Sequence, residues 1–390
     1  MLHTVIMNHV NSYISPLQHG FVKGRSVETN LCMFTQFVTE NIDAGTQVDT
    51  IYIDFSKAFD RLDHYKLLDK LSSFGFSDNL IIFFATYLTG RKQRVMCSGY
   101  ESVEINVTSG VPQGSVLGPL FFNLFVNDIT DNLNSPALLY ADDMKLFRKI
   151  TSREDQLKLQ ADLQLVCDRS KQCGLSINSA KCNVVTFSLK SKVLIFDYGI
   201  DNVQVCRKNV IRDLGVTFDV KMTFIYHYEQ IMSSALKNLG FIIRNCRKFQ
   251  DTETIKPLYF SFVRSKLEFA SIIWSPGYNI HTVALEKIQR RFLKFLFFLS
   301  FGHYPNRGYP HETLLDMFNV KSLEQRRVAS SLIFLHKLVT GSIDCSSLLA
   351  ELDFHVPRLH IRNNDTFYLP TARINLQKFS PIFTMCRKYN

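Results

Sequence analysis

Two short apolar runs enclose a pair of adjacent aspartates, Asp142 and Asp143, in the stretch Leu138–Phe147. This pattern predicts a β-hairpin whose tip carries both carboxylates. Adjacent like charges repel, and a fold tolerates them best where a cation neutralises both. Carboxylate oxygens are hard ligands that suit Mg²⁺. The pair therefore indicates either a metal site or a plain acidic turn, and other stretches of the chain have to distinguish the two.

The composition limits the class of protein. Of 390 residues, 46% are hydrophobic and 21% are charged, which is typical of a folded globular chain with two or three domains. The formal net charge of +10 favours a polyanionic partner, either nucleic acid or an anionic membrane surface. The nine cysteines show no CxxC spacing, which indicates reduced thiols and argues against a zinc site. The most apolar runs are too short to cross a bilayer, so we expect a soluble, intracellular protein.

A glycine-punctuated basic loop at residues 18–26 precedes an apolar helical run from Val27 to about Asn41. Its backbone amides, Lys23 and Arg25 are suited to approach a phosphate. A plain surface turn has the same composition, so both interpretations stay open at this point.

A β-branched and aromatic run ends at Asp54, and the pattern after it is helical through Leu71. An aspartate at the carboxyl end of a strand is a common metal ligand in α/β architecture. The same position also suits a helix N-cap. Because Asp54 is far from Asp142 in the sequence, these two carboxylates can meet only through tertiary structure.

A bent loop stands between the two acidic stretches. Residues 109–119 contain three glycines and two prolines, so their backbone can approach a flat ligand closely. Gln113 offers a donor and an acceptor at the apex. Pro119 suits the first turn of an apolar helix over Leu120–Val126. Just before the loop, residues 93–97 and 103–108 predict a hairpin.

The chain after the aspartate pair alternates between helix and strand. Thr151 and Glu154 predict a capping box that opens a helix, and Gly174 predicts its end. We expect strands over Asn183–Phe187 and over Ile211–Phe218. This alternation with antiparallel hairpins indicates an α+β sheet with helices on one face.

Beyond about Lys221 the pattern becomes helical, with Pro257 in the first turn of one helix and a Ser322–Gln325 capping box before another. The apolar residues at helical spacing are Ile255, Leu258, Tyr259, Phe262 and Val263, followed by Leu285, Ile288, Phe292 and Phe295. A basic face beside the second set consists of Lys287, Arg290, Arg291 and Lys294. This face indicates either a grip on a phosphate backbone or a solvated charged surface.

Taken in order, these stretches resemble the reverse transcriptase of non-LTR retrotransposons, most closely that of the jockey-like elements. The matching motifs are Gln18-x-Gly20-Phe21, Asp54-Phe55-Ser56-Lys57-Ala58-Phe59-Asp60, Val111-Pro112-Gln113-Gly114-Ser115, Tyr140-Ala141-Asp142-Asp143, Leu175-x-x-Asn178-x-x-Lys181 and Leu214-Gly215. Each motif alone is weak, whereas the ordered set is specific. The likeness continues more loosely through the helical tail.

The resemblance implies an α+β right-hand polymerase with a split βαβ palm, partial fingers and a helical thumb. The partial fingers would occupy residues 1–48, the palm 49–220 with a fingers insertion at about 75–108, and the thumb with a C-terminal extension 221–390. It also implies an RNA-directed DNA polymerase that uses an RNA template, a DNA primer and deoxynucleoside triphosphates. Its location would be the nucleus, the cytoplasm or both, and an element-encoded RNA-binding protein would be a further partner.

The resemblance also implies roles for individual residues. Asp54, Asp142 and Asp143 would hold two Mg²⁺ ions, for which Mn²⁺ can substitute, and Lys181 would protonate the leaving pyrophosphate. Phe59 matches the steric-gate position, where its ring excludes a ribose 2′-hydroxyl. The other substrate-binding positions are Phe55, Gln113, Gly114, Lys23 and Arg25, and the nucleic-acid-binding positions are Lys287, Arg290, Arg291 and Lys294.

The sequence departs from the family in lacking its Arg-Pro-Ile fingers stretch and its amino-terminal endonuclease. We therefore expect a copy truncated at the amino end or an incomplete gene model. A viral-type RNA-dependent RNA polymerase shares the palm, and Asp60 would then read the 2′-hydroxyl, but Phe59 and the residues 112–114 favour a DNA-synthesising enzyme. The second alternative is a catalytically silent nucleic-acid-binding remnant, against which the intact Asp54 and Asp142 argue.

Overall fold

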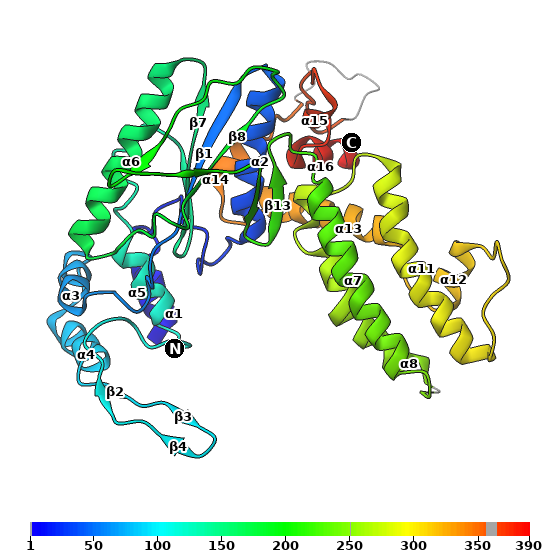
Figure 1. The fold of residues 1–390 in the computed structure, drawn as a ribbon, viewed down its shortest axis with the longest axis horizontal. Coiled ribbons are helices and arrows are strands. Elements are labelled where there is room, and N and C mark those ends of the chain that lie inside the picture. Colours follow the sequence, from blue (N-terminus) through cyan, green and yellow to red (C-terminus); the bar gives the residue numbers. More distant parts are fainter. Residues whose placement is uncertain (1, 250, 356–364) are drawn as a thin grey trace. The chain divides into compact units, whose positions relative to one another are not determined.

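The computed structural model describes residues 2–249, 251–355 and 365–390. They form two compact units (Figure 1), which we call the N-terminal unit and the C-terminal unit. The N-terminal unit consists of the residues up to Asn30 and of Gly45–Asn209, and the C-terminal unit consists of Leu31–Ala44 and Val210–Asn390. Across the described ranges, no helix has the length and apolar character that a membrane span needs.

The N-terminal unit is built on a mixed sheet with the strand order β11–β8–β1–β7–β6. Strand β1 is antiparallel to both β7 and β8, β6 and β7 form a hairpin, and β11 runs parallel to β8. Ile53 at the end of β1 lies opposite Met144 at the start of β7, so the next residues, Asp54 and Asp143, lie at the same edge of the sheet. The strands are β1 (Gln47–Ile53), β6 (Ala137–Tyr140), β7 (Asp143–Ile150), β8 (Asn183–Phe187) and β11 (Cys206–Arg207).

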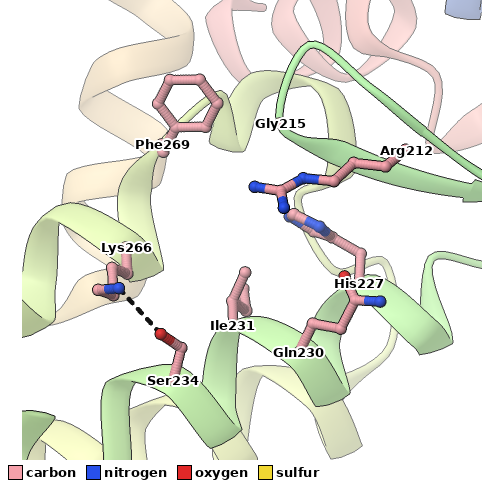
Figure 2. A pocket seen from close by; sticks show the side chains of 8 residues that line it. All are labelled: Arg212, Gly215, His227, Gln230, Ile231, Ser234, Lys266 and Phe269. Carbon is pink, nitrogen blue, oxygen red and sulfur yellow. Dashed lines mark hydrogen bonds between the residues drawn. The ribbon is translucent and has the colours of Figure 1, made fainter.

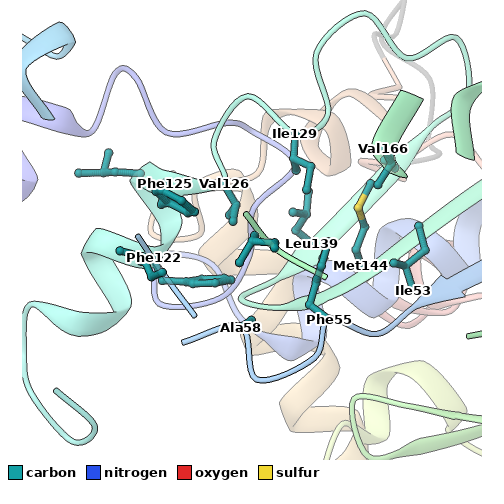
Figure 3. Packing of buried hydrophobic residues seen from close by; sticks show 14 of the residues in the cluster. Ile53, Phe55, Ala58, Phe122, Phe125, Val126, Ile129, Leu139, Met144 and Val166 are labelled. Atoms are coloured by element: carbon teal, nitrogen blue, oxygen red, sulfur yellow. The ribbon is translucent and has the colours of Figure 1, made fainter. Parts of the chain in front are cut away.

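Helices cover the apolar face of this sheet, and α6 packs against β7 while α3 packs against α4 and α5. Ile51 and Ile53 alternate along β1 toward the same core, where Ile53, Leu139 and Met144 are buried together (Figure 3). The predicted α+β class is confirmed. The helices of this unit are α1 (Leu2–Val10), α3 (His64–Ser73), α4 (Asp78–Leu88), α5 (Gly118–Phe125) and α6 (Arg153–Cys173), with a short pair of strands, β9 (Gly199–Ile200) and β10 (Val203–Gln204).

Most predicted elements of the first half of the chain are confirmed. Helix α2 (Val27–Asp43) begins where expected, Pro119 lies in the first turn of α5, and α6 ends before Gly174, whose φ is 81°. The predicted hairpin consists of two paired segments, β2 (Lys92–Gln93) with β5 (Ile105–Asn106) and β3 (Met96–Cys97) with β4 (Tyr100–Glu101).

The prediction of a helix directly after Asp54 is wrong. Residues 55–63 form a bridge and turns, and α3 begins only at His64. The Asp63 carboxylate caps this helix by accepting a hydrogen bond from the backbone N–H of Lys66 at 3.0 Å. Residues 55–63 therefore form a loop between β1 and α3 at the sheet edge.

Two further boundaries differ from the prediction. The capping box of α6 consists of Ser152 and Asp155, each one residue later than the predicted Thr151 and Glu154. The Asp155 carboxylate also accepts a hydrogen bond from the backbone N–H of Thr151. The strand expected over residues 211–218 is a hairpin of β12 (Val210–Asp213) and β13 (Val216–Asp219). Its turn forms at Leu214-Gly215, where both residues have positive φ.

The C-terminal unit is helical beyond this hairpin, as predicted. The apolar stripe of α11 is buried and stacks Phe292 on Tyr259 at a ring distance of 4.0 Å. The capping box of Ser322 and Gln325 is confirmed. The helices are α7 (Ile225–Asn245), α8 (Thr252–Tyr259), α9 (Ser265–Glu268), α10 (Ser271–Trp274), α11 (Asn279–Phe301), α12 (His311–Met317), α13 (Leu323–Val339), α14 (Ser346–Ala350), α15 (Asn375–Lys378) and α16 (Pro381–Tyr389).

Two predictions about α8 are wrong. The Asp251 side chain caps this helix, so Pro257 lies in its interior and not in its first turn. A π-helical turn, η1 (Phe260–Arg264), follows, in which the Ser265 N–H group donates to the Phe260 carbonyl. This wider turn shifts the residues after it around the helix axis. Phe262 lies within this turn and is 55% exposed, although its spacing predicts a buried position.

Candidate active site

The aspartate pair lies at the tip of the β6–β7 hairpin, as predicted. Tyr140 pairs with Asp143, which leaves Ala141 and Asp142 as a two-residue turn. Ala141 has a φ of 56°, a left-handed conformation that costs a non-glycine residue about 1–2 kcal/mol. Neighbouring groups must therefore hold the turn in this form.

Gln18 supplies those groups. Its Oε1 accepts hydrogen bonds from the N–H groups of Ala141 at 2.9 Å and Gly20 at 2.8 Å, and its Nε2 donates to the Ala141 carbonyl at 3.3 Å. The loop itself lies along the edge of β6, where the N–H of His19 donates to the Leu139 carbonyl at 2.9 Å. Gln18 and His19 are both buried, so this contact fixes the hairpin tip from outside the sheet.

The space beside the tip admits no side chain at Gly20. A Cβ atom added there would lie 2.3 Å from the Ala141 nitrogen, and no small shift relieves this clash because that nitrogen belongs to the backbone. Arg25 supports the same loop by donating to the carbonyls of Ser15 and Gln18 at 2.8 Å each. Lys23 is exposed on this loop.

Asp54 and Asp142 interact electrostatically across the sheet edge. Burial raises the pKa of the Asp142 carboxyl, a hydrogen bond from its own backbone N–H opposes this, and the negative charge of Asp54 raises the pKa further. A cation between the two carboxylates would remove that repulsion. Asp143, the next residue, is exposed at the same edge.

A third segment brings Lys181 to this edge. Phe55 pairs with Ile177 in an antiparallel bridge, and the N–H of Asn178 donates to the Asp54 carbonyl at 2.8 Å. Lys181 follows in the same turn, and its Nζ lies 3.8 Å from Asp54 Oδ2. The structure therefore brings together three predicted residues, Asp54, Asp142 and Lys181, from separate parts of the chain.

The glycine-proline loop is attached to the segment after Asp54. Gln113 Nε2 donates to Asp60 Oδ1 at 3.0 Å, and the Val111 N–H donates to the Phe59 carbonyl at 3.0 Å. Gly110 packs so closely on the Asp60 backbone that a Cβ would lie 2.7 Å from it. These contacts fix Gln113 relative to the strand that ends at Asp54.

Phe59 is half-buried, with its ring stacked on that of Phe122 at a centroid distance of 4.3 Å. The stacking restricts the orientation of the Phe59 ring. Gly114 is exposed with a φ of 76° and open space around its Cα, whereas Phe55 is buried in the core.

The basic residues predicted to bind nucleic acid lie on α11 of the C-terminal unit. Lys287 and Arg291 are exposed, and Arg290 donates to the Tyr309 carbonyl at 2.6 Å. Lys294 is half-buried.

Within the described ranges, no group of three or more His, Cys, Asp or Glu side chains is arranged to hold a metal ion by itself. The Asp54–Asp142 pair nevertheless fits Mg²⁺, which proteins commonly hold through one or two carboxylates while substrate phosphates and water complete the coordination. The donors are hard oxygens and their charges repel each other, as a cation site requires.

Comparison with known proteins decides the family. The model of the family described as reverse transcriptase (RNA-dependent DNA polymerase) matches residues 1–243, which is more than half of the chain. This chain belongs to the reverse transcriptase family. With this membership, the expected right-hand polymerase class and the resemblance to non-LTR elements are confirmed.

Relatives of this reverse transcriptase include retrotransposon proteins. It is 26% identical over 288 residues to the probable RNA-directed DNA polymerase from transposon X-element of Drosophila melanogaster. The aligned region covers 70% of this chain and 31% of the relative. It is 25% identical over 312 residues to the RNA-directed DNA polymerase from mobile element jockey of Drosophila funebris, covering 75% and 34%. The chain thus spans about a third of the length of these curated relatives.

Among solved structures, telomerase from Candida tropicalis in complex with a fragment of telomeric RNA is similar with a TM-score of 0.40 and 13% identity. The match covers 81% of this chain and 52% of that chain. A likeness this weak says nothing about activity.

Sequence reasoning assigned no role to Gln18, Gly20 or Gly110. Gly20 contains a partial signal, because glycine is the residue that permits close approach of another backbone segment. The partner of that contact is Ala141, which is distant in the sequence and becomes apparent only from the pairing of the loop with β6.

Proposed function

We propose that this chain is the core of an RNA-directed DNA polymerase that adds deoxynucleotides to a primer 3′ hydroxyl on an RNA template. The observation that carries the proposal is the convergence of Asp54, Asp142 and Lys181 at one sheet edge. In this assignment residues 49–220 form the palm, residues 1–48 and about 75–108 belong to the fingers, and residues 221–390 form the thumb and a C-terminal extension.

Asp54 and Asp142, assisted by Asp143, would hold two Mg²⁺ ions, or Mn²⁺ in their place. When bound, these ions supply activation of the 3′ hydroxyl and stabilisation of the leaving pyrophosphate. Two ionised carboxylates that repel each other when no cation is present are suited to this task, because bound metal lowers their energy.

The other residues position and protonate the substrate. Lys181 Nζ lies 3.8 Å from Asp54 Oδ2 and would act as a general acid toward the pyrophosphate. The Phe59 ring, held by Phe122, would fill the space that a ribose 2′-hydroxyl needs. Gln113 would orient the incoming deoxynucleoside triphosphate, and Gly114, Lys23 and Arg25 would line its site. The predicted contact of Phe55 with substrate does not fit its burial in the core, from which it would support the site.

Primer extension by the full chain on an RNA template with Mg²⁺ tests this proposal. We expect the wild type to extend the primer with deoxynucleotides and the Asp142→Ala variant to lose extension. Both proteins should still bind the duplex. Equal signals from the two proteins would contradict the proposal and favour a nucleic-acid-binding remnant. Preferred incorporation of ribonucleotides would favour an RNA polymerase instead.

A further inference from the structure

Asp60 presents a carboxylate beside the loop that carries Gln113. Gln113 Nε2 donates a hydrogen bond to Asp60 Oδ1 at 3.0 Å. Both side chains are exposed, so a substrate can reach them. Within the described ranges, Asp60 forms no ion pair, and Gln113 Oε1 accepts no hydrogen bond from the protein. The pair is therefore open to a ligand on the side of Gln113 Oε1.

The backbones of the two segments are held together next to this hydrogen bond. Ser109 Oγ donates to the Asp60 carbonyl at 2.8 Å, and the Gly110 N–H donates to the Leu62 carbonyl at 2.7 Å. A Cβ atom on Gly110 would lie 2.7 Å from the Asp60 backbone, so the two chains are in close contact. The Asp60 carboxylate consequently starts from a fixed place relative to the base of the Gln113 side chain.

The Asp60 carboxylate decides which way the Gln113 amide points. An ionised carboxylate only accepts hydrogen bonds, whereas an amide has a donor at its nitrogen and an acceptor at its oxygen. If the amide were reversed, Gln113 Oε1 would face Asp60 Oδ1, and two acceptors repel each other. The nitrogen of Gln113 therefore faces Asp60, and Oε1 is turned away from it.

This orientation limits which group of a nucleotide Gln113 can recognise. The triphosphate carries negative charge, which the Asp60 carboxylate repels. Gln113 Oε1 needs a hydrogen-bond donor, and the donors of the base are used in pairing with the template. The sugar of a deoxynucleotide has one donor, the 3′ hydroxyl. Phe59, directly before Asp60 in the chain, is the proposed wall at this sugar. Position and chemistry thus both favour the sugar as the partner of Gln113.

We propose that Asp60 is a positioning residue, which holds the Gln113 amide so that Oε1 accepts a hydrogen bond from the 3′ hydroxyl of the incoming deoxynucleotide. Asp60 itself does not touch the nucleotide. This role rests on the proposed function, because it requires a nucleotide in the site. It differs from direct contact between Asp60 and a ribose 2′-hydroxyl, and the experiment separates the two.

Single-nucleotide primer extension on an RNA template tests this role. It compares kcat/KM for deoxythymidine triphosphate with kcat/KM for the 2′,3′-dideoxy analogue, which lacks only the 3′ hydroxyl. We expect Gln113→Ala and Asp60→Ala each to lower the preference for the deoxynucleotide by about 10-fold. The double variant should lower it no further, because both substitutions remove the same contact. Asp60→Asn keeps an acceptor oxygen beside Gln113 and should retain most of the preference.

Gln230→Ala is the matched control for the loss of a glutamine amide. Gln230 lines a hollow in the C-terminal unit (Figure 2), where its Oε1 accepts a hydrogen bond from Thr217 Oγ1 at 2.7 Å. This variant should keep the wild-type preference. A wild-type preference in Asp60→Ala, or a further loss in the double variant, would overturn the role of Asp60. A change only in the preference for deoxynucleotides over ribonucleotides would overturn it too, in favour of direct 2′-hydroxyl contact.

A second measurement reads the hydrogen bond without turnover. NMR of the full chain with ¹⁵N-labelled glutamine side chains reports the Gln113 amide, which Gln113→Ala assigns. We expect Asp60→Ala to move these amide resonances, and Asp69→Ala, which removes an exposed carboxylate on α3, to leave them in place. Unmoved resonances in Asp60→Ala would overturn the positioning role. Moved resonances in a chain that extends no primer would support the positioning of Gln113 and contradict the proposed function alone.

Discussion

The Gln18 side chain forms two hydrogen bonds with Ala141, one accepted from its N–H at 2.9 Å and one donated to its carbonyl at 3.3 Å. This contact holds a strained residue, with a φ of 56°, directly before Asp142. The position of the Asp142 carboxylate therefore depends on a loop more than a hundred residues earlier in the chain.

Gln18→Ala should destabilise the fold and slow synthesis. The substitution leaves the buried N–H groups of Ala141 and Gly20 without an acceptor, which costs about 1–3 kcal/mol. Urea unfolding measures the loss, and primer extension measures the effect on Asp142. Gln164→Ala, on the exposed face of α6, is the control and should change stability by less than about 0.5 kcal/mol. Equal losses for both variants would show that the hydrogen bonds between Gln18 and Ala141 have no special role.

Gly20→Ala should be at least as damaging. Its methyl group would lie 2.3 Å from the Ala141 nitrogen, so the hairpin tip has to move. We expect a loss of about 2 kcal/mol or more in the free energy of unfolding together with reduced extension. Gly199→Ala is the matched control, because a Cβ there has only an ordinary 3.7 Å contact. Wild-type stability in Gly20→Ala would mean that the loop does not press on the tip.

Phe59→Val should admit ribonucleotides. Loss of the ring opens space for a 2′-hydroxyl, and we expect the ratio of kcat/KM for deoxynucleotides over ribonucleotides to fall by about 10- to 100-fold. Phe59→Tyr keeps the ring on Phe122 and should keep the discrimination. Steady-state single-nucleotide incorporation measures both. Unchanged discrimination in Phe59→Val would remove Phe59 from the sugar site.

Lys181→Met should lower kcat by about 10²- to 10⁴-fold, the usual contribution of a general acid. Its thermal stability should stay near that of the wild type, because an ion pair with 69% of the lysine side chain exposed contributes little. Lys190→Met, an exposed lysine nearby in sequence, is the control. A full rate in Lys181→Met would leave the ion pair without a chemical role.

The ionisation of Asp142 should be visible in the stability of the metal-free protein. Its pKa is raised in the folded state by burial and by Asp54, so the folded protein binds this proton more tightly than the unfolded chain does. The corresponding stability is present at low pH and is lost as the pH rises through the folded pKa. In EDTA, Asp142→Asn should therefore have the higher Tm at neutral pH.

Calorimetry from about pH 4 to pH 7 measures this difference. The Tm advantage of Asp142→Asn over the wild type should grow as the pH rises, and Asp168→Asn controls for the loss of one exposed charge on α6. A Tm difference between Asp142→Asn and the wild type that shrinks toward neutral pH would contradict this prediction.

Local patterns were sufficient to predict the elements that carry the acidic residues. Alternation and turn composition define the hairpin of Asp142, and the end of a β-branched run defines the position of Asp54. The motif spacing also predicted Lys181, which the bridge between Phe55 and Ile177 brings to Asp54. These features depend on a few neighbouring residues each.

Features that depend on tertiary contacts or on a change of helical pitch could not be predicted. The role of Gln18 requires its loop to lie along β6, which no local pattern shows. The π-helical turn after Pro257 preserves an apolar spacing that looks α-helical, so Phe262 was expected to be buried. Both cases concern backbone geometry that side-chain patterns do not report.

The central claim is that Asp54 and Asp142 act as one unit in nucleotidyl transfer. Single-turnover incorporation of one deoxynucleotide on an RNA template, measured for Asp54→Asn, Asp142→Asn and the double variant, tests it most directly. We expect each single substitution to lower the rate by about 10³-fold or more, and the double variant to be no slower than either. A wild-type rate in Asp54→Asn, or losses that simply multiply in the double variant, would contradict the account.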